Sequence, residues 1–271
     1  MARLGFIGPG QLGGPMVERL LAAGHELTVH ARRPNRRDEL SALGAVVVDD
    51  PRAAARDAEL LICCTFSDSQ LRAALIDDGA LAAMVAGTAV VSHVTGDPVL
   101  VDELAALAPA GVAIVDAPVS GTAEQIRHAA LTVLIGGDGA VVERVTAVIG
   151  AYADPVIHVG RRGDALRAKI INNILFAANV RLAGEVHRVA SAMRMDFDVL
   201  VGAIDRCSGS TAALNIASAM GNERLQTGSR PFLEKDVAVV AEVARTSGID
   251  LGELLRVAAV YLPEENRANA S

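Results

Sequence analysis

Three glycines near the N-terminus constrain the fold of this chain more than any other feature. Gly8, Gly10 and Gly13 follow an apolar run that starts at Leu4, and they precede a stretch with helical spacing. In G-x-G-x-x-G spacing the first glycine permits a tight turn, the second lets a ligand approach the backbone, and the third packs helix against strand. The N–H groups that start such a helix bind phosphate. The segment predicts a strand–turn–helix unit that holds a dinucleotide pyrophosphate, with Pro9, Gln11 and Leu12 completing the loop.

The first 160 residues alternate short apolar runs with amphipathic stretches. Runs typical of strands lie at 4–8, 26–30, 45–48, 60–65, 89–92, 112–116 and 131–135. Helical stretches are expected at 12–23, 70–75, 98–107 and 140–149. This alternation predicts an α/β fold with a doubly wound, mostly parallel sheet of the Rossmann type.

The pattern changes after Gly160, where no strand-like alternation is left. A long helix is expected at about 164–193, followed by helices at 197–204, 211–220, 232–246 and 251–261. We therefore expect a dinucleotide-binding domain at 1–160 and an all-α domain at 161–271, joined through the long helix. Residues 264–271 are expected to form a loose tail.

The end of the second predicted strand bears on the choice of cofactor. An NAD site places a carboxylate there, about 20 residues after the glycines, to bind the adenosine ribose. This chain has Arg32 and Arg33 instead. Guanidinium groups suit a 2′-phosphate because they form forked, charge-assisted hydrogen bonds. The pair favours NADP(H) over NAD(H); the alternative is a solvated basic turn that touches no ligand.

The composition argues against several other classes of protein. The net charge is −7 and there is no tryptophan, so neither a basic surface nor stacking rings for nucleic acid are expected. No apolar run approaches the ~18 residues that a membrane span needs. The three cysteines and six histidines lack metal-ligand spacing, so no metal site is expected, and the cysteines are typical of reduced thiols in a cytoplasmic protein.

Three further segments suggest hydride chemistry. The first is Asp116-Ala117-Pro118-Val119-Ser120-Gly121-Thr122, which follows a predicted strand and so falls at the carboxyl edge of the sheet, where ligands of open α/β folds bind. The second runs from Gly160-Arg161-Arg162-Gly163 to Lys169, Asn172 and Asn173. The third is Lys235-Asp236. In content, order and spacing this chain resembles, over nearly its whole length, the 3-hydroxyisobutyrate dehydrogenase-like (β-hydroxyacid dehydrogenase) family of the 6-phosphogluconate dehydrogenase superfamily.

The resemblance implies a role for each matching residue. Ser120, Gly121 and Thr122 would hold the acid group of a small carboxylate substrate. Lys169 would act as the general acid/base, a role suited to an ammonium group beside a forming alkoxide. Asn173 would orient the substrate, and Asn172, which lies with it within one helical turn of Lys169, would bind it.

The resemblance also implies roles for Thr95 and Lys235 and an oligomeric state. Thr95 would contact the nicotinamide side, and Lys235 would reach the cofactor or the substrate carboxylate. A homodimer or homotetramer is implied by the helical second domain. The chemistry would be NADP(H)-dependent hydride exchange between nicotinamide and a small β-hydroxyacid or the corresponding semialdehyde or keto acid.

The chain departs from the family pattern at several positions. Thr122 and Gln125 stand where glycines are common, and Ser92 and Val94 stand where Asp and Ser are expected before Thr95. These changes leave the substrate open. Two alternatives stay open as well, an imine reductase-like NADPH enzyme and a non-catalytic dinucleotide-binding protein.

Overall fold

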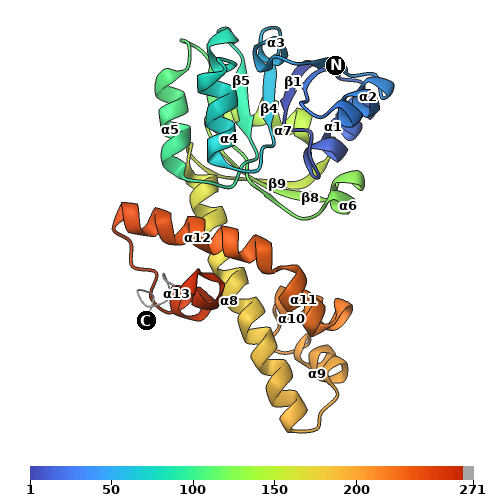
Figure 1. Ribbon diagram of the computed structural model, residues 1–271, viewed down its shortest axis with the longest axis vertical. Coiled ribbons are helices and arrows are strands. Elements are labelled where there is room, and N and C mark those ends of the chain that lie inside the picture. The colour runs from blue at the N-terminus through green and yellow to red at the C-terminus, as the bar shows by residue number, and fades with distance from the viewer. Residues whose placement is uncertain (265–271) are drawn as a thin grey trace. The chain divides into compact units, whose positions relative to one another are not determined.

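A nine-stranded sheet forms the centre of the N-terminal part of the chain in the computed structural model, which describes residues 1–264 (Figure 1). Its strands are β1 (Arg3–Ile7), β2 (Glu26–His30), β3 (Val46–Val48), β4 (Leu60–Cys63), β5 (Ala89–Ser92), β6 (Ala113–Asp116), β7 (Val119–Ser120), β8 (Leu131–Gly136) and β9 (Ala153–Gly160). They run in the order β3-β2-β1-β4-β5-β6-β8-β7, with β9 paired to β8. The pairs from β3 to β6 are parallel, whereas β8 is antiparallel to β6 and β7.

Helices between the strands give each face of the sheet its own apolar core. They are α1 (Gly13–Ala22), α2 (Pro34–Ala42), α3 (Pro51–Ala55), α4 (Asp68–Arg72), the π-helix η1 (Ala73–Asp77), the 3₁₀ helix η2 (Leu81–Ala83), α5 (Pro98–Leu107), α6 (Ala123–Arg127) and α7 (Gly139–Ile149). Phe6 of β1 packs in one core with residues of α1 and α7, and Leu61 of β4 packs in the other with residues of α4 and α5. Because both faces are covered, the predicted doubly wound fold is confirmed.

The chain divides into two compact units after Lys169. Helix α8 (Asp164–Ala192) starts in the first unit and continues into the second. The second unit is helical, with α9 (Phe197–Ile204), α10 (Ala212–Met220), α11 (Asn222–Gly228), α12 (Arg230–Ser247), α13 (Gly252–Ala258) and the 3₁₀ helix η3 (Ala259–Tyr261). Its core includes Ile174, Val180, Val237 and Tyr261. The predicted all-α second part is therefore also confirmed.

The structure adds elements that the apolar pattern does not predict. Strand β9 buries only Ala153, so it carries no apolar run, and α2 buries only Leu40. The stretch expected as one helix at 70–75 is divided between α4 and η1. Apart from Glu264, the predicted tail lies outside the described residues. Within residues 1–264, no helix combines the length and the apolar character that crossing a membrane requires.

Candidate functional site

The glycine loop after β1 has the geometry that its spacing predicts. Gly8 has a φ of +87°, and a Cβ there would lie 2.6 Å from the carbonyl oxygen of Cys64. A Cβ on Gly13 would lie 2.3 Å from the carbonyl oxygen of Gly8, so α1 packs against the turn only because residue 13 has no side chain. A Cβ on Gly10 would meet nothing within 4 Å. Gly8 and Gly13 are thus required by packing, while Gly10 leaves its backbone open to a ligand.

The N-terminus of α1 behind this loop is suited to an anion. Leu12, its N-cap residue, makes no side-chain cap, and the first turn contains no acidic residue. The N–H groups of a first helical turn lack partners within the helix, and the helix dipole favours negative charge there. A dinucleotide pyrophosphate fits the loop for both reasons.

A cavity of about 670 Å³ opens beside the loop, within the first unit. Arg32 and Arg33 are both exposed, and of the two Arg33 alone lines the cavity. Arg36 and Arg127 bring two further guanidinium groups. The cavity is completed by Pro9, Gly10, Gln11, Pro15, Glu18, Pro34, Asn35 and Glu39. Three arginines against two glutamates make this a wall suited to phosphate groups.

Arg36 lines the cavity beside the glycine loop, although the sequence pattern did not single it out. Its Nε donates to the carbonyl oxygen of Pro9 at 3.1 Å, and its Nη1 donates to Glu39 at 2.6 Å. A Cβ on Gly14 would overlap its Nη2, at 1.7 Å, so the glycine makes room for the guanidinium against the first turn of α1. The sequence signals only the start of α2, through Pro34 in its first turn, and does not reveal that Arg36 reaches the loop.

Strands β5 and β6 end at the same edge of the sheet as β1. They are parallel neighbours, with Ser92 opposite Asp116. Thr95 follows β5 and is partly buried. Ser120 ends β7, opposite Thr132 of β8, and is exposed together with Gly121. This edge therefore carries both the segment expected at the nicotinamide and the segment expected at the substrate carboxylate.

The two departures from family glycines after Ser120 have a structural reason. The hydroxyl of Thr122 accepts from the N–H of Gln125 at 3.3 Å, and Oε1 of Gln125 accepts from the N–H of Thr122 at 2.9 Å. This reciprocal capping box starts α6. The same Oε1 would lie 2.7 Å from a Cβ on Gly121, which has a φ of +143°. Thr122 and Gln125 thus fix the turn beside Ser120.

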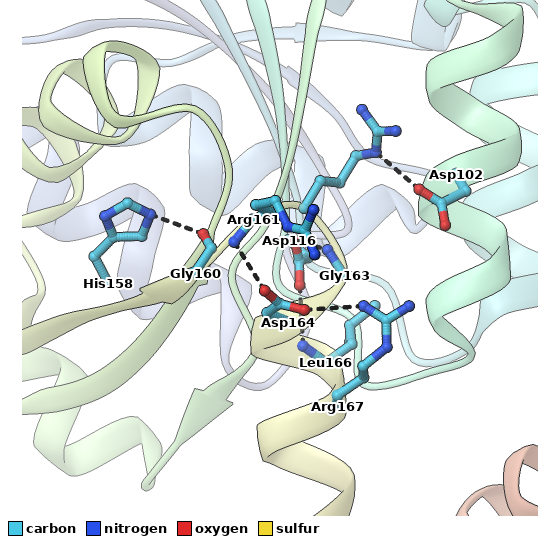
Figure 2. A network of polar contacts seen from close by, with 10 residues as sticks. Asp102, Asp116, His158, Gly160, Arg161, Gly163, Asp164, Leu166 and Arg167 are labelled. Carbon is cyan, nitrogen blue, oxygen red and sulfur yellow. Dashed lines mark hydrogen bonds and ion pairs between the residues drawn. The ribbon is translucent and has the colours of Figure 1, made fainter.

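Asp116, the first residue of the segment that leads to Ser120, holds the start of α8. It is the last residue of β6 and is fully buried, and its carboxylate accepts from the N–H groups of Gly163 at 2.8 Å and Leu166 at 3.0 Å (Figure 2). Burial raises the pKa of Asp116, while these backbone bonds oppose the shift. The side chain therefore anchors the start of α8 to the sheet.

Helix α8 carries the lysine and the two asparagines. Lys169 and Asn173 are buried, with 8% and 6% of their surface exposed. Asn172 is exposed, and its Nδ2 donates to Oδ1 of Asn173 at 3.2 Å. Lys169 closes the first unit, whereas the asparagines and the partly buried Lys235 of α12 belong to the second. Burial of a lysine and an amide on the same helix is uncommon, because both side chains are usually exposed.

Metal-ligating side chains do not gather in the part of the chain that the structure describes. Within residues 1–264, no group of three or more histidine, cysteine or acidic side chains is placed to hold an ion. Cys63 is buried and Cys64 partly so, and burial raises the pKa of Cys64 to about 12, so this thiol stays protonated near neutral pH.

Comparison with known proteins places this geometry in context. Residues 3–160 match the family of the NAD binding domain of 6-phosphogluconate dehydrogenase. An NAD-dependent L-serine dehydrogenase from Pseudomonas aeruginosa is 31% identical over 218 residues, which cover 80% of this chain and 73% of the relative.

Two solved structures share the fold along almost the whole chain. A 3-hydroxyisobutyrate dehydrogenase from Mycobacterium tuberculosis, solved with L-serine, superposes with a TM-score of 0.87 at 24% identity, covering 96% of this chain and 92% of that one. The protein Psf3, solved in complex with NADP+ and 2-OPP, superposes with a TM-score of 0.79 at 26% identity, covering 95% of this chain and 92% of that one.

Proposed function

The chain belongs to the 3-hydroxyisobutyrate dehydrogenase-like family of NAD(P)-binding oxidoreductases, and from that membership we propose that it exchanges a hydride between NADP(H) and a small β-hydroxyacid or the corresponding semialdehyde or keto acid. The observation that carries the proposal is the buried Lys169 on α8, whose first turn is bonded to the end of β6 by Asp116. The relative named above acts on L-serine, which is itself a small β-hydroxyacid.

The dinucleotide is assigned to the glycine loop and the cavity beside it. Gly8, Gly10 and Gly13, with Pro9, Gln11 and Leu12 between them, would hold the pyrophosphate. Arg32 and Arg33 would bind the 2′-phosphate of NADP(H), and the position of Arg33 on the cavity wall supports this preference. The L-serine dehydrogenase is NAD-dependent by name, whereas Psf3 was solved with NADP+. The two point to different cofactors, so the proposed preference for NADP(H) rests on the arginines of this chain. When bound, the nicotinamide supplies or accepts the hydride.

Lys169 is the proton donor and acceptor in this proposal. In the direction of reduction its ammonium group gives a proton to the alkoxide that forms on the substrate. In the direction of oxidation its neutral amine takes the proton from the hydroxyl group. Asn173 orients the substrate, and the bond from Asn172 to Asn173 Oδ1 holds that amide in one orientation.

The substrate carboxylate is assigned to Ser120, Gly121 and Thr122. The exposed Ser120 hydroxyl and nearby backbone N–H groups are donors of the kind that bind a carboxylate. Asn172 is proposed to contribute to substrate binding, Thr95 to line the nicotinamide side, and Lys235 to reach the cofactor or the carboxylate.

We also propose the division of labour and the assembly. Residues 1–160 would bind the dinucleotide, and 161–271 would bind substrate and form a homodimer or homotetramer. Exposed apolar residues recur every seven positions along α8, at Leu175, Leu182 and Val189, a spacing suited to a partner helix. A cytoplasmic location accords with three cysteines that form no disulfide.

The test is a panel of small acids followed at the nicotinamide absorbance, with both cofactors. The panel contains β-hydroxyacids, their semialdehydes and keto acids, and cyclic imines. We expect turnover of a β-hydroxyacid or its carbonyl partner, whereas reduction of the imines alone would replace this function with that of an imine reductase.

The catalytic role is tested with Lys169→Ala and with Lys169→Arg, which keeps the charge but cannot lose its proton near neutral pH. Both should lower kcat by about 10²- to 10⁴-fold and leave the Kd for NADPH nearly unchanged. Turnover close to wild type in either purified variant would exclude the lysine as acid/base.

A further inference from the structure

A buried histidine joins three segments of the first unit. His93 directly follows β5 and is 4% exposed, and Tyr152, between α7 and β9, is completely buried. Nδ1 of His93 lies 2.6 Å from the carbonyl oxygen of Ala117, the residue after β6, and Nε2 lies 2.7 Å from the Tyr152 hydroxyl. The two rings meet edge to face, with centroids 5.8 Å apart. His93 therefore bridges the ends of two neighbouring strands.

The partners determine which ring nitrogen carries the proton. A carbonyl oxygen only accepts, so Nδ1 of His93 must donate to Ala117. In the neutral ring Nε2 then has a free lone pair, and it accepts from the hydroxyl of Tyr152. Burial also lowers the pKa of His93 to about 4, which keeps the ring neutral near neutral pH. The carbonyl of Ala117 thus fixes the tautomer, and the hydroxyl of Tyr152 satisfies Nε2.

The backbone of His93 and Ala117 continues the hydrogen bonding of the sheet by one residue beyond β5 and β6. The N–H of His93 donates to the carbonyl of Cys63 at 2.8 Å, and the N–H of Ala117 donates to the carbonyl of Ser92 at 2.7 Å. Beyond these bonds the first segment leads within two residues to Thr95, and the second leads through Pro118 to Ser120. The bond between the His93 ring and Ala117 lies where the two segments leave the sheet.

We propose that His93 is a positioning residue that sets the distance between the Thr95 segment and the Ser120 segment, by donating from Nδ1 to the carbonyl of Ala117. The proposal rests on the proposed function for what each segment binds, the nicotinamide side and the substrate carboxylate. His93 is buried and touches neither ligand, so it acts through the segments that it joins. A small shift between them would misplace the substrate relative to the cofactor, and misplacement of about 1 Å can cost about 10²-fold in rate.

The test compares two substitutions of the ring. In His93→Asn the amide Nδ2 stands near the place of Nδ1 and can still donate to Ala117, whereas His93→Leu removes the donor and keeps apolar bulk. We expect His93→Leu to lower kcat/KM for the acid substrate by roughly 10- to 100-fold, with the Kd for NADPH changed less than about twofold. His93→Asn should recover most of the loss. Equal kcat/KM in the wild type and both folded variants, with only the melting temperature lowered, would overturn the proposal.

Tyr152→Phe provides a second variant that keeps the packing of the ring. It should give a smaller loss of kcat/KM than His93→Leu, because Nδ1 can still donate to Ala117 and only the bond from the Tyr152 hydroxyl to Nε2 is lost.

Nitrogen-15 NMR of the histidine ring supplies a readout that needs no substrate. We expect a neutral ring with its proton on Nδ1 throughout pH 5.5–8 in the wild type, and the same tautomer in Tyr152→Phe, because the carbonyl of Ala117 accepts in both. A proton on Nε2, or titration near the ordinary value of 6.5, would refute the bridge itself. If the NMR result holds but no acid in the panel is turned over, the failure lies in the proposed function and not in the bridge.

Discussion

Replacing Asp116 should reveal how much the start of α8 depends on one carboxylate. Asp116→Ala removes the acceptor of two buried N–H groups, those of Gly163 and Leu166. Each buried donor left without a partner costs about 1–3 kcal/mol, so the free energy of unfolding should fall by about 2–6 kcal/mol. Asp116→Asn keeps the shape and one acceptor but turns an NH₂ group toward the second N–H. It should cost about 1–3 kcal/mol.

The same substitutions should lower turnover, because Lys169 lies less than two helical turns after the anchored start of α8. We expect kcat to fall more in Asp116→Ala than in Asp116→Asn, while the Kd for NADPH stays near wild type. Calorimetric unfolding and steady-state kinetics measure both effects. Wild-type stability and kcat in Asp116→Ala would show that the helix start is held by other contacts.

The pH dependence of the free energy of unfolding provides an independent check on the burial of Asp116, because the direction of the change can be predicted. Burial raises the folded-state pKa of Asp116 above 3.8, so the folded protein keeps this proton to higher pH than the unfolded chain. The contribution of this group to the free energy of unfolding is therefore fully present below pH 3.8 and falls as pH rises through the folded pKa. Asp116→Asn cannot titrate, so its stability relative to the wild type should improve as pH rises through that interval. An opposite slope would contradict the assigned burial.

Three further substitutions test other parts of the site. Arg33→Ala should weaken NADPH binding by about 10- to 100-fold in calorimetric titration and leave NADH binding almost unchanged. Arg32→Ala should have the smaller effect, because Arg33 lines the cavity and Arg32 does not. Thr122→Ala should lower thermal stability by about 1 kcal/mol through loss of the α6 cap and raise KM for the acid substrate. As pH falls from 6.5 to about 4, the unfolded chain binds a proton that folded His93 resists, so stability should drop by up to about 3 kcal/mol in the wild type but not in His93→Leu.

The fold could be predicted wherever burial leaves an apolar run. Strands β1, β4 and β5 lie inside the sheet with both faces covered, so their residues are almost all apolar and were predicted. Strand β9 pairs only with β8 among the described strands and fully buries only one of its residues, so its sequence has no such run. Helix α6 has only five residues, too few for a periodic pattern, although its Thr-x-x-Gln cap at 122–125 was a readable signal.

The site could be predicted where sterics dictate the residue. Gly8 and Gly13 are required by close backbone contacts, so their spacing identifies the loop. The partners of Arg36 and His93 could not be predicted, because each side chain reaches a backbone carbonyl 24 or more positions away in the sequence. Any residue can offer such a carbonyl, so no sequence pattern marks it.

The segment after β6 combines several structural bonds with the exposed side chain of Ser120. Successive side chains of an extended chain point to opposite sides, so only some can face a ligand at the sheet edge. Asp116 bonds to α8, the carbonyl of Ala117 accepts from His93, and Thr122 caps α6, while Ser120 is exposed between them. Each anchor restrains the position of Ser120 from a different element. Ordering a binding group in advance lowers the entropy lost when a ligand binds, so under the proposed assignment of Ser120 to the substrate these anchors would raise affinity without touching the ligand.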